Sequence, residues 1–125
     1  MHDATSPATA VASRYLQALA RQDWEVVTKC LAPNVRRFGP FGDDFDGAMD
    51  YTSFLRETMS SLPGYRMDLD RVTHLSERRA MVELRETIEV DGGPMVTHEC
   101  LVFETDGSGL LTEICIYIRQ ASQRH

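Results

Sequence analysis

The chain has 125 residues, a length typical of one domain, and its 42% hydrophobic and 26% charged residues are ordinary for a globular protein. Its formal net charge of −6 disfavours nucleic acid, and both basic doublets, Arg36-Arg37 and Arg78-Arg79, have acidic residues nearby. No apolar run approaches the roughly 20 residues that span a bilayer, and the N-terminus lacks a signal-peptide pattern. We therefore expect a soluble, cytoplasmic protein with no nucleic-acid or membrane partner.

The cysteines and histidines indicate no metal centre. Cys30, Cys100 and Cys115 are odd in number, widely spaced and set among apolar residues, as is typical of reduced thiols in a core. There is no CxxC motif, and no two of the four histidines have metal-ligand spacing. We expect neither a metal nor a cofactor.

Two helices are predicted at the start of the chain. Ser6-Pro7 has the pattern of an N-cap followed by proline in the first helical turn, and an amphipathic stripe follows it. Asp23 can cap a second helix, whose apolar face runs as far as Leu31. Pro33 is expected to end that helix.

A third helix follows a glycine-rich loop. The segment from Val35 to Phe38 is short and extended, and the loop covers residues 39–47. Apolar residues then recur at helical spacing from Ala48 to Leu62, and Pro63-Gly64 ends the helix.

From Tyr65 onward the apolar period changes to two. Four strands are predicted, over Tyr65–Leu75, Met81–Val90, Val96–Thr105 and Leu111–Arg119, joined by tight turns. Three helices followed by an antiparallel meander form an α+β domain with the helices on one face of the sheet. We expect a single domain over residues 1–125 with an ordered core at about 7–119, and frayed ends that include Gln120 to His125.

Several motifs resemble the nuclear transport factor 2-like superfamily, which includes ketosteroid isomerases and SnoaL-like polyketide cyclases. The opening Ser13–Leu19, Asp23-Trp24 and Leu31–Val35 resembles its two-helix start, and Asp106–Gly109 resembles the turn before its last strand. The resemblance spans about Ala8 to Arg119. It implies a cone-shaped (cystatin-like) fold enclosing a pocket, often in a homodimer packed through the outer face of the sheet. The superfamily contains both enzymes and non-enzymes, so its fold does not fix a function.

The resemblance carries over only in part to the catalytic residues. Tyr15 matches the ketosteroid-isomerase tyrosine that donates a hydrogen bond to the developing oxyanion, and it can equally be a helix-packing tyrosine. Gly39 stands where that family has its general-base aspartate, which argues against steroid-type isomerisation. The family's protonated aspartate matches Glu99 if the extra residue of the alignment lies in the last turn. It matches Leu101 if that residue lies in the preceding hairpin. An epoxide-hydrolase assignment is weaker, because Cys115-Ile116-Tyr117 has no carboxylate.

Strand parity independently selects two carboxylates. Glu86 shares a face with the apolar residues of its strand, and Glu99 shares a face with Leu101 and Phe103 of the next strand. A four-residue turn sets Glu86 opposite Glu99, and one of the two carboxyls would then keep its proton, which supplies an acid and a base. A three-residue turn instead sets Glu86 opposite His98 and Arg85 opposite Glu99. Family alignment favours the first register and charge pairing favours the second.

We therefore hypothesise a domain that binds a small hydrophobic molecule. In the enzymatic version it is a cofactor-independent isomerase, dehydratase or cyclase that uses Tyr15, Glu86 and Glu99 for acid–base catalysis, with an aspartate of the 39–47 loop as another candidate base. In the alternative version it is a non-catalytic ligand-binding or dimeric interaction module. The residues expected to bind the ligand are Trp24, Phe38, Phe41, Phe45, Met67, His98, Leu101 and Phe103.

Overall fold

A computed structural model of the chain describes residues 6–119. The frayed ends expected at the first residues and at Gln120 to His125 lie outside this range. The elements are α1 (Pro7–Ala20), α2 (Trp24–Lys29), β1 (Leu31–Phe38), β2 (Phe45–Asp46), α3 (Ala48–Met59), β3 (Arg66–Ser76), β4 (Arg79–Val90), β5 (Gly93–Thr105) and β6 (Leu111–Arg119). Within the described residues no helix is long and apolar enough to cross a bilayer.

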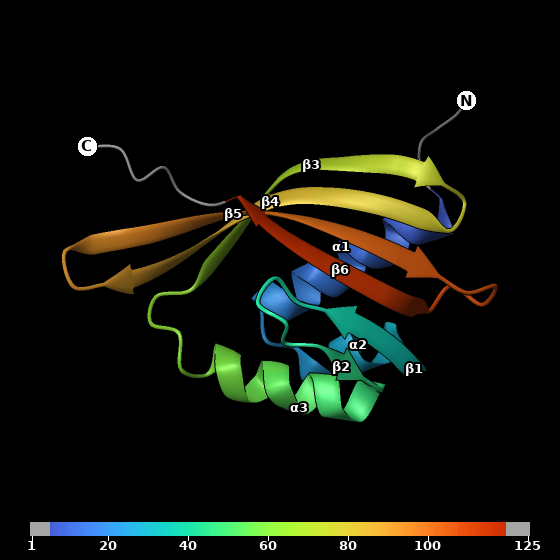
Figure 1. Cartoon of the computed structure of the whole chain (residues 1–125), viewed down its shortest axis with the longest axis horizontal. Helices are drawn as coiled ribbons and strands as arrows, with labels where there is room; N and C mark the ends of the chain where they lie inside the picture. The colour runs from blue at the N-terminus through green and yellow to red at the C-terminus, as the bar shows by residue number, and fades with distance from the viewer. Residues whose placement is uncertain (1–5, 120–125) are drawn as a thin grey trace.

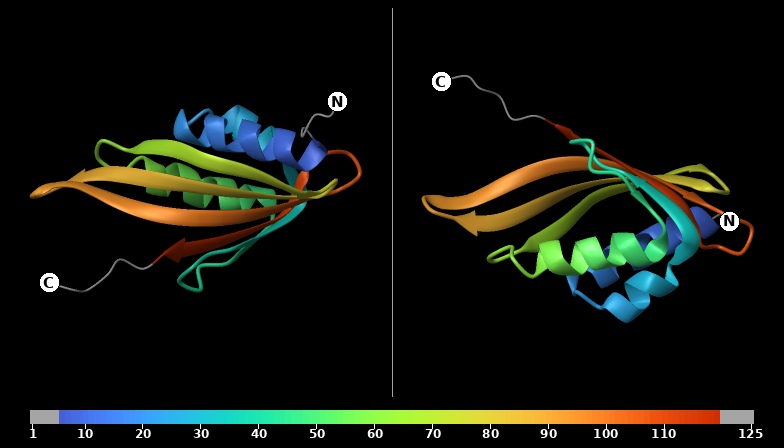
Figure 2. Two further views of the ribbon diagram at one scale, coloured as in Figure 1. Left: turned by 90° about the horizontal axis from the view of Figure 1, so that it is seen from above. Right: turned by 60° about the horizontal axis from the view of Figure 1, so that its bottom comes forward.

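The six strands form one curved sheet in the order β2-β1-β6-β5-β4-β3. All neighbours are antiparallel except β1 and β6, which run parallel. Figures 1 and 2 show the three helices on the concave side of this sheet. The predicted α+β fold, with helices packed on a curved sheet, is confirmed, and the parallel β1–β6 pair makes the sheet mixed.

Local signals explain the helix boundaries. The side chain of Ser6 accepts a hydrogen bond from the Thr9 amide at 3.2 Å, in a reciprocal capping box. Helix α2 begins after its Asp23 cap but ends at Lys29, so the prediction that it reaches Leu31 and ends at Pro33 is wrong. Both residues lie in β1, where the β1–β6 register is irregular between Leu31 and Arg36 and leaves room for a residue without an N–H.

Helix α3 also ends earlier than predicted, at Met59 rather than Leu62. The amides of Ser61 and Leu62 bond to carbonyls three residues back, at 3.1 and 3.2 Å, so the chain tightens into turns after the last α-helical residue.

The core lies between the helices and the concave face of the sheet. Tyr15 and Leu16 of α1 pack there with Val82 of β4 and Phe103 of β5, and all four are at most 1% exposed. Val90, at the end of β4, is 42% exposed because the β4–β5 hairpin extends beyond the helices (Figure 1).

The β4–β5 register differs from both predicted alternatives. Val90 pairs with Gly93, so only Asp91 and Gly92 connect the strands. Asp-Gly is a strong signal for a two-residue hairpin. The shorter connection places Glu86 opposite Thr97 rather than opposite Glu99 or His98.

Candidate functional site

A cavity of about 430 Å³ lies between α1, α3 and the concave face of β4, β5 and β6. Most of its wall is apolar, from side chains such as Leu19, Met59 and Ile118. The polar side chains that reach it are few: Tyr15, Arg37, Asp43, Tyr51, Thr58, Glu86, Thr97 and Glu99. An apolar hollow with a few convergent polar groups is typical of small-molecule sites.

Two of these polar groups are carboxyls on neighbouring strands. Glu99 pairs directly with Leu84, so Glu86 and Glu99 share the concave face as diagonal neighbours rather than as an opposed pair. Burial, a hydrogen bond with Glu86 and the charge of Glu86 raise the pKa of Glu99 to about 9, while the charge of Arg37 opposes the shift. Glu99 therefore holds its proton at neutral pH and can donate a hydrogen bond.

Glu86 has a second partner, Tyr65, in the connection between α3 and β3. The Tyr65 hydroxyl donates a hydrogen bond to Oε2 of Glu86. Burial and the adjacent charge of Glu86 raise the pKa of Tyr65, so the tyrosine stays a donor. This contact holds the Glu86 carboxylate in place as an acceptor inside the cavity.

A pair of tyrosines forms another part of the wall. The hydroxyls of Tyr15 in α1 and Tyr51 in α3 are 2.5 Å apart, and both side chains are at most 1% exposed. Burial is the main reason that both pKa values are raised, so both are neutral phenols at physiological pH. Tyr15 also packs edge-to-face on Phe103, with ring centroids 5.9 Å apart.

Arg37 of β1 is a buried cation beside this pair, and only 7% of the residue is exposed. Its Nη1 donates to Oδ2 of Asp43 at 2.8 Å and to the Asp43 carbonyl oxygen at 2.7 Å. The guanidinium also faces three aromatic rings, those of Phe45, Tyr51 and Phe54, at 5.3 to 5.8 Å from their centroids.

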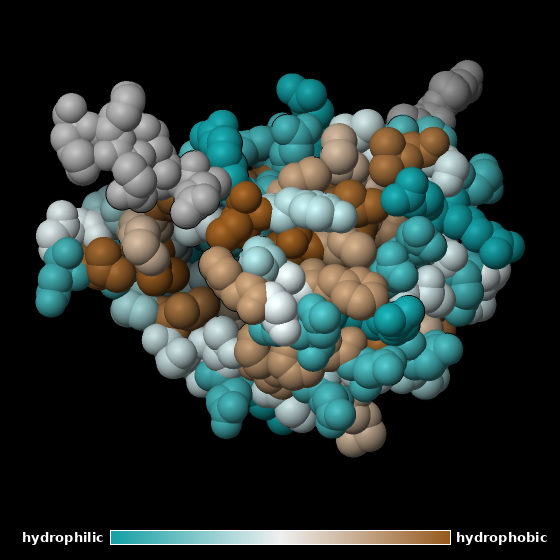
Figure 3. Space-filling model, viewed as in Figure 1, coloured by the Kyte–Doolittle hydropathy of each residue, from teal (hydrophilic) through white to brown (hydrophobic). Residues whose placement is uncertain are grey.

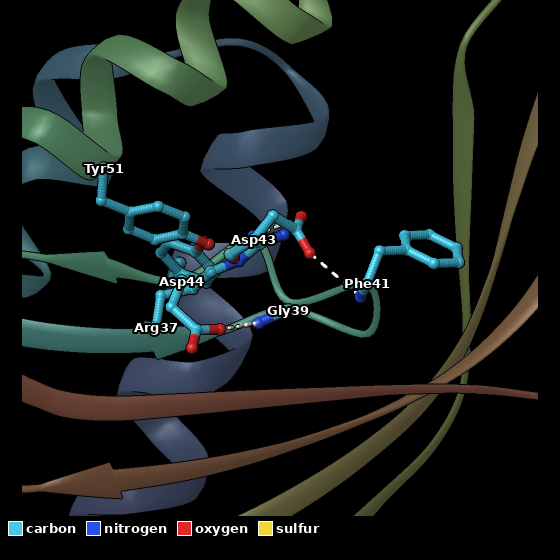
Figure 4. Close-up of polar contacts among 7 residues, drawn as sticks. Arg37, Gly39, Phe41, Asp43, Asp44 and Tyr51 are labelled. Carbon is cyan, nitrogen blue, oxygen red and sulfur yellow. Dashed lines mark hydrogen bonds and ion pairs between the residues drawn. The ribbon is translucent and has the colours of Figure 1, made fainter.

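Asp43 belongs to the loop between β1 and β2 (Figure 4). Burial alone would raise the pKa of Asp43, but hydrogen bonds from Arg37 and from the Phe41 amide lower it overall. The carboxylate is thus held as an anion that neutralises Arg37 and fixes the loop.

Gly39 has a structural reason to lack a side chain. A methyl group at this position would lie 2.2 Å from Oδ1 of Asp43 and 2.7 Å from Nη1 of Arg37. The space in which a side chain of residue 39 would begin is occupied by the Arg37–Asp43 ion pair. A side chain at position 39 would therefore require the Asp43 carboxylate and the Arg37 guanidinium to shift from this arrangement.

The structure brings Tyr15, Glu86 and Glu99 to one cavity, but only some of the residues expected to bind a ligand line it. Phe41, Met67 and Leu101 do so. The expected residues outside the lining are Trp24, Phe38, Phe45, His98 and Phe103.

Strand parity and core packing explain three of these exceptions. His98 pairs with Arg85 on the convex face, where Arg85 bonds to Asp70 at 2.9 Å rather than to Glu99. Phe103 is fully buried behind Tyr15. Phe45 stacks on Phe54, with centroids 4.4 Å apart.

Sequence reasoning missed three residues of the site: Arg37, Tyr51 and Tyr65. The arginine belongs to a basic doublet that resembles a surface feature, and its burial depends on Asp43, six residues away. Tyr51 lies on the apolar stripe of α3, which identifies it only as a core residue. In residues 6–119, no group of three or more His, Cys, Asp or Glu side chains is placed to hold a metal.

Comparison with solved structures shows that the architecture is shared. A Mycobacterium tuberculosis LEH-like epoxide hydrolase has a TM-score of 0.77 at 19% identity, over 90% of this chain and 83% of that one. An M. tuberculosis protein solved in complex with estradiol-17beta-hemisuccinate has a TM-score of 0.73 at 18% identity, over 90% and 94%. An NTF2-like protein of unknown function from Burkholderia pseudomallei has a TM-score of 0.79 at 19% identity, over 92% of both chains.

At these identities the likeness establishes the fold alone. No curated protein matches the chain. The family model for the SnoaL-like domain matches residues 12–114, which covers most of the chain and both carboxyl-bearing strands. The chain therefore belongs to the SnoaL-like domain family.

Proposed function

We propose that this SnoaL-like domain is a cofactor-independent enzyme that rearranges a small hydrophobic molecule by general acid–base catalysis. The observation that carries the proposal is the pair of carboxyls, Glu86 and Glu99, facing one apolar cavity, with the Glu99 pKa raised to about 9. A neutral carboxylic acid next to a carboxylate supplies a proton donor and a proton acceptor at the same pH.

The two carboxyls have different roles in this proposal. Glu86 accepts a proton from a carbon next to a carbonyl group, and the electron pair of that C–H bond moves into the carbonyl. Glu99 gives its proton to the carbonyl oxygen, so that an enol forms and no net charge develops. Tyr15 adds a hydrogen bond to the same oxygen. Isomerisation, dehydration and cyclisation can all proceed from such an enol.

The lining supports an apolar ligand of modest size. Phe41, Met67 and Leu101 contribute hydrophobic surface without polar groups of their own. The M. tuberculosis protein of the same fold that was solved in complex with estradiol-17beta-hemisuccinate supports a small-molecule ligand for this architecture.

An alternative function is a non-catalytic ligand-binding or dimeric interaction module, and the absence of a carboxylate at Gly39 favours it. In either version we propose a cytoplasmic homodimer packed through the convex face of the sheet. Apolar side chains gather in the middle of the face that β6 crosses (Figure 3), and Tyr117 of β6 is 58% exposed.

Deuterium exchange tests the shared chemical step without a known substrate. A panel of small apolar ketones is incubated with the protein in D₂O, and loss of the α-proton signals is followed by NMR. We expect exchange for ketones that bind, a loss of about 100-fold or more in Glu86→Gln, and full activity in the control Glu83→Gln on the convex face. Binding without exchange would support the ligand-binding alternative. No binding by any ketone of the panel would contradict both ligand-binding versions and leave the dimeric interaction module.

A further inference from the structure

The wall of the cavity has a gap where the sheet is incomplete. Strand β1 ends at Phe38, which pairs with Cys115, but β6 continues to Arg119. Within residues 6–119, the end of β6 after Cys115 therefore has a neighbouring strand on the β5 side alone. On the other side of β6 the chain has already left the sheet and entered the loop between β1 and β2.

A second hollow of about 360 Å³ lies at this gap. It is lined by Pro40 and Phe41 of the loop and by Ile116, Tyr117 and Ile118 of β6. Successive side chains of a strand point to opposite faces, so a hollow that includes Tyr117 and both isoleucines passes round the edge of β6. All of these residues except Tyr117 also line the cavity. The hollow and the cavity are therefore continuous.

Phe41 lies at the junction of the two spaces, and 80% of this large apolar residue is exposed. Its amide donates to Oδ1 of Asp43 at 3.1 Å, and the Gly39 amide donates to Oδ1 of Asp44 at 3.3 Å, so the loop backbone is held in place. Figure 4 shows the Phe41 ring directed away from Asp43 and Arg37. An aromatic ring fixed in this way beside an apolar cavity offers contact surface to an apolar ligand.

The hollow and the cavity differ in polarity. The cavity contains the carboxyls of Glu86 and Glu99. The side chains that line the hollow carry no charge, and the Tyr117 hydroxyl is their single polar group. A charged group would lose its water there without gaining a partner. A ligand that fills both spaces therefore has a polar reacting end and an uncharged, apolar extension.

We propose that the ligand is an elongated molecule whose reacting end lies in the cavity and whose uncharged, apolar tail leaves through the gap beside β6, between Phe41 and Tyr117. Phe41 is the specificity-determining residue for this tail. The inference rests on the proposed function in placing the carbonyl end of the ligand at Glu86 and Glu99. The tail site itself concerns binding and does not depend on catalysis.

NMR of the protein with methyl ketones of increasing chain length tests the tail site. We expect nuclear Overhauser contacts between the terminal methyl group of methyl decyl ketone and the rings of Phe41 and Tyr117. Tyr117 lines the hollow but not the cavity, so contact with its ring locates the tail in the gap. Contacts confined to residues of the cavity such as Met59, or a hollow filled by a second copy of the chain, would overturn the proposal.

Affinities provide an independent readout. Each methylene group that leaves water tightens binding by up to about fourfold, so affinity should rise from methyl butyl ketone to methyl decyl ketone. We expect Phe41→Ala to weaken binding of the decyl ketone about tenfold or more and of the butyl ketone by about twofold at most. Equal losses for the two ketones in Phe41→Ala would refute the tail site.

Two control variants separate the tail site from general apolar contact. Met67 lines the cavity and not the hollow, so Met67→Ala should weaken both ketones by similar factors. Met49 is 82% exposed and lines neither space, so Met49→Ala should change neither affinity. An effect of Met49→Ala as large as that of Phe41→Ala would contradict a specific role for Phe41.

The results also separate this inference from the proposed catalysis. If the tail contacts Tyr117 while no ketone shows deuterium exchange, the tail site stands and the enzymatic proposal fails. If short ketones exchange but the long ketone makes no contact with Tyr117, the tail site fails alone. If no ketone binds at any chain length, both are contradicted.

Discussion

Replacement of Glu99 by glutamine should remove a fall in the free energy of unfolding that the natural protein undergoes as the pH rises. The variant should therefore become more stable than the natural protein with increasing pH. The folded protein holds the Glu99 proton up to a pKa of about 9, whereas the unfolded chain releases it near the ordinary value of 4.5. Between these values the native state binds one more proton than the unfolded state, so the stability of the natural protein falls with pH. Glutamine keeps the shape and an N–H donor toward Glu86 but has no proton to lose.

The size of the effect follows from the pKa difference. Each pKa unit corresponds to about 1.4 kcal/mol, so the natural protein loses about 3 kcal/mol by pH 7 and about 6 kcal/mol by pH 9 through this one group. Below pH 4.5 the carboxyl is protonated in both states and the two proteins should be equally stable. A domain of this size is stable by only about 5–15 kcal/mol, so the change is readily measured.

Urea unfolding at pH 4.5, 7 and 9, followed by the fluorescence of Trp24, the single tryptophan, provides the assay. The matched control is Glu83→Gln, which removes a carboxylate from the convex face of the adjacent strand and should show no such trend. A difference between Glu99→Gln and the natural protein that stays constant from pH 4.5 to 9 would refute the reasoning.

Two further substitutions test other contacts of the site. Tyr65→Phe removes the hydroxyl that donates to Glu86, and we expect a loss of about 1–3 kcal/mol in the free energy of unfolding at pH 7, because a partly buried carboxylate loses one of its two donors; an unchanged urea midpoint would contradict this. Gly39→Ala places a methyl group 2.2 Å from Oδ1 of Asp43 and should cost about 1–3 kcal/mol in thermal or urea unfolding. Its control is Gly107→Ala, whose added methyl would lie 3.5 Å from its nearest neighbour; equal effects of the two would argue against the crowding.

The fold was largely predictable because its signals are local. Caps such as Ser6 and Asp23, the helical spacing and the change to a period of two all act within a few residues. The β1–β6 pair was not predictable, because a parallel pairing of distant segments leaves no local mark. Pro33 also suggested the end of a helix where the structure has a strand.

The candidate site was predictable where it depends on strand parity. That rule places Glu86 and Glu99 on one face in the observed register, even though both predicted turn lengths were wrong. Arg37 could not be identified this way. Its burial results from a carboxylate in a loop and from rings on α3 and β2, contacts that exist only after the chain has folded.

The central claim is that one proton resides on the Glu86–Glu99 pair at neutral pH. The most direct measurement is a pH titration of the side-chain carboxyl carbons by ¹³C NMR, with Glu86→Gln and Glu99→Gln used for assignment. The structure predicts that Glu99 is protonated at pH 7 and titrates at about 9. If Glu99 instead titrates near the ordinary value of 4.5, the site lacks a neutral acid beside a base, and the proposed acid–base function is contradicted.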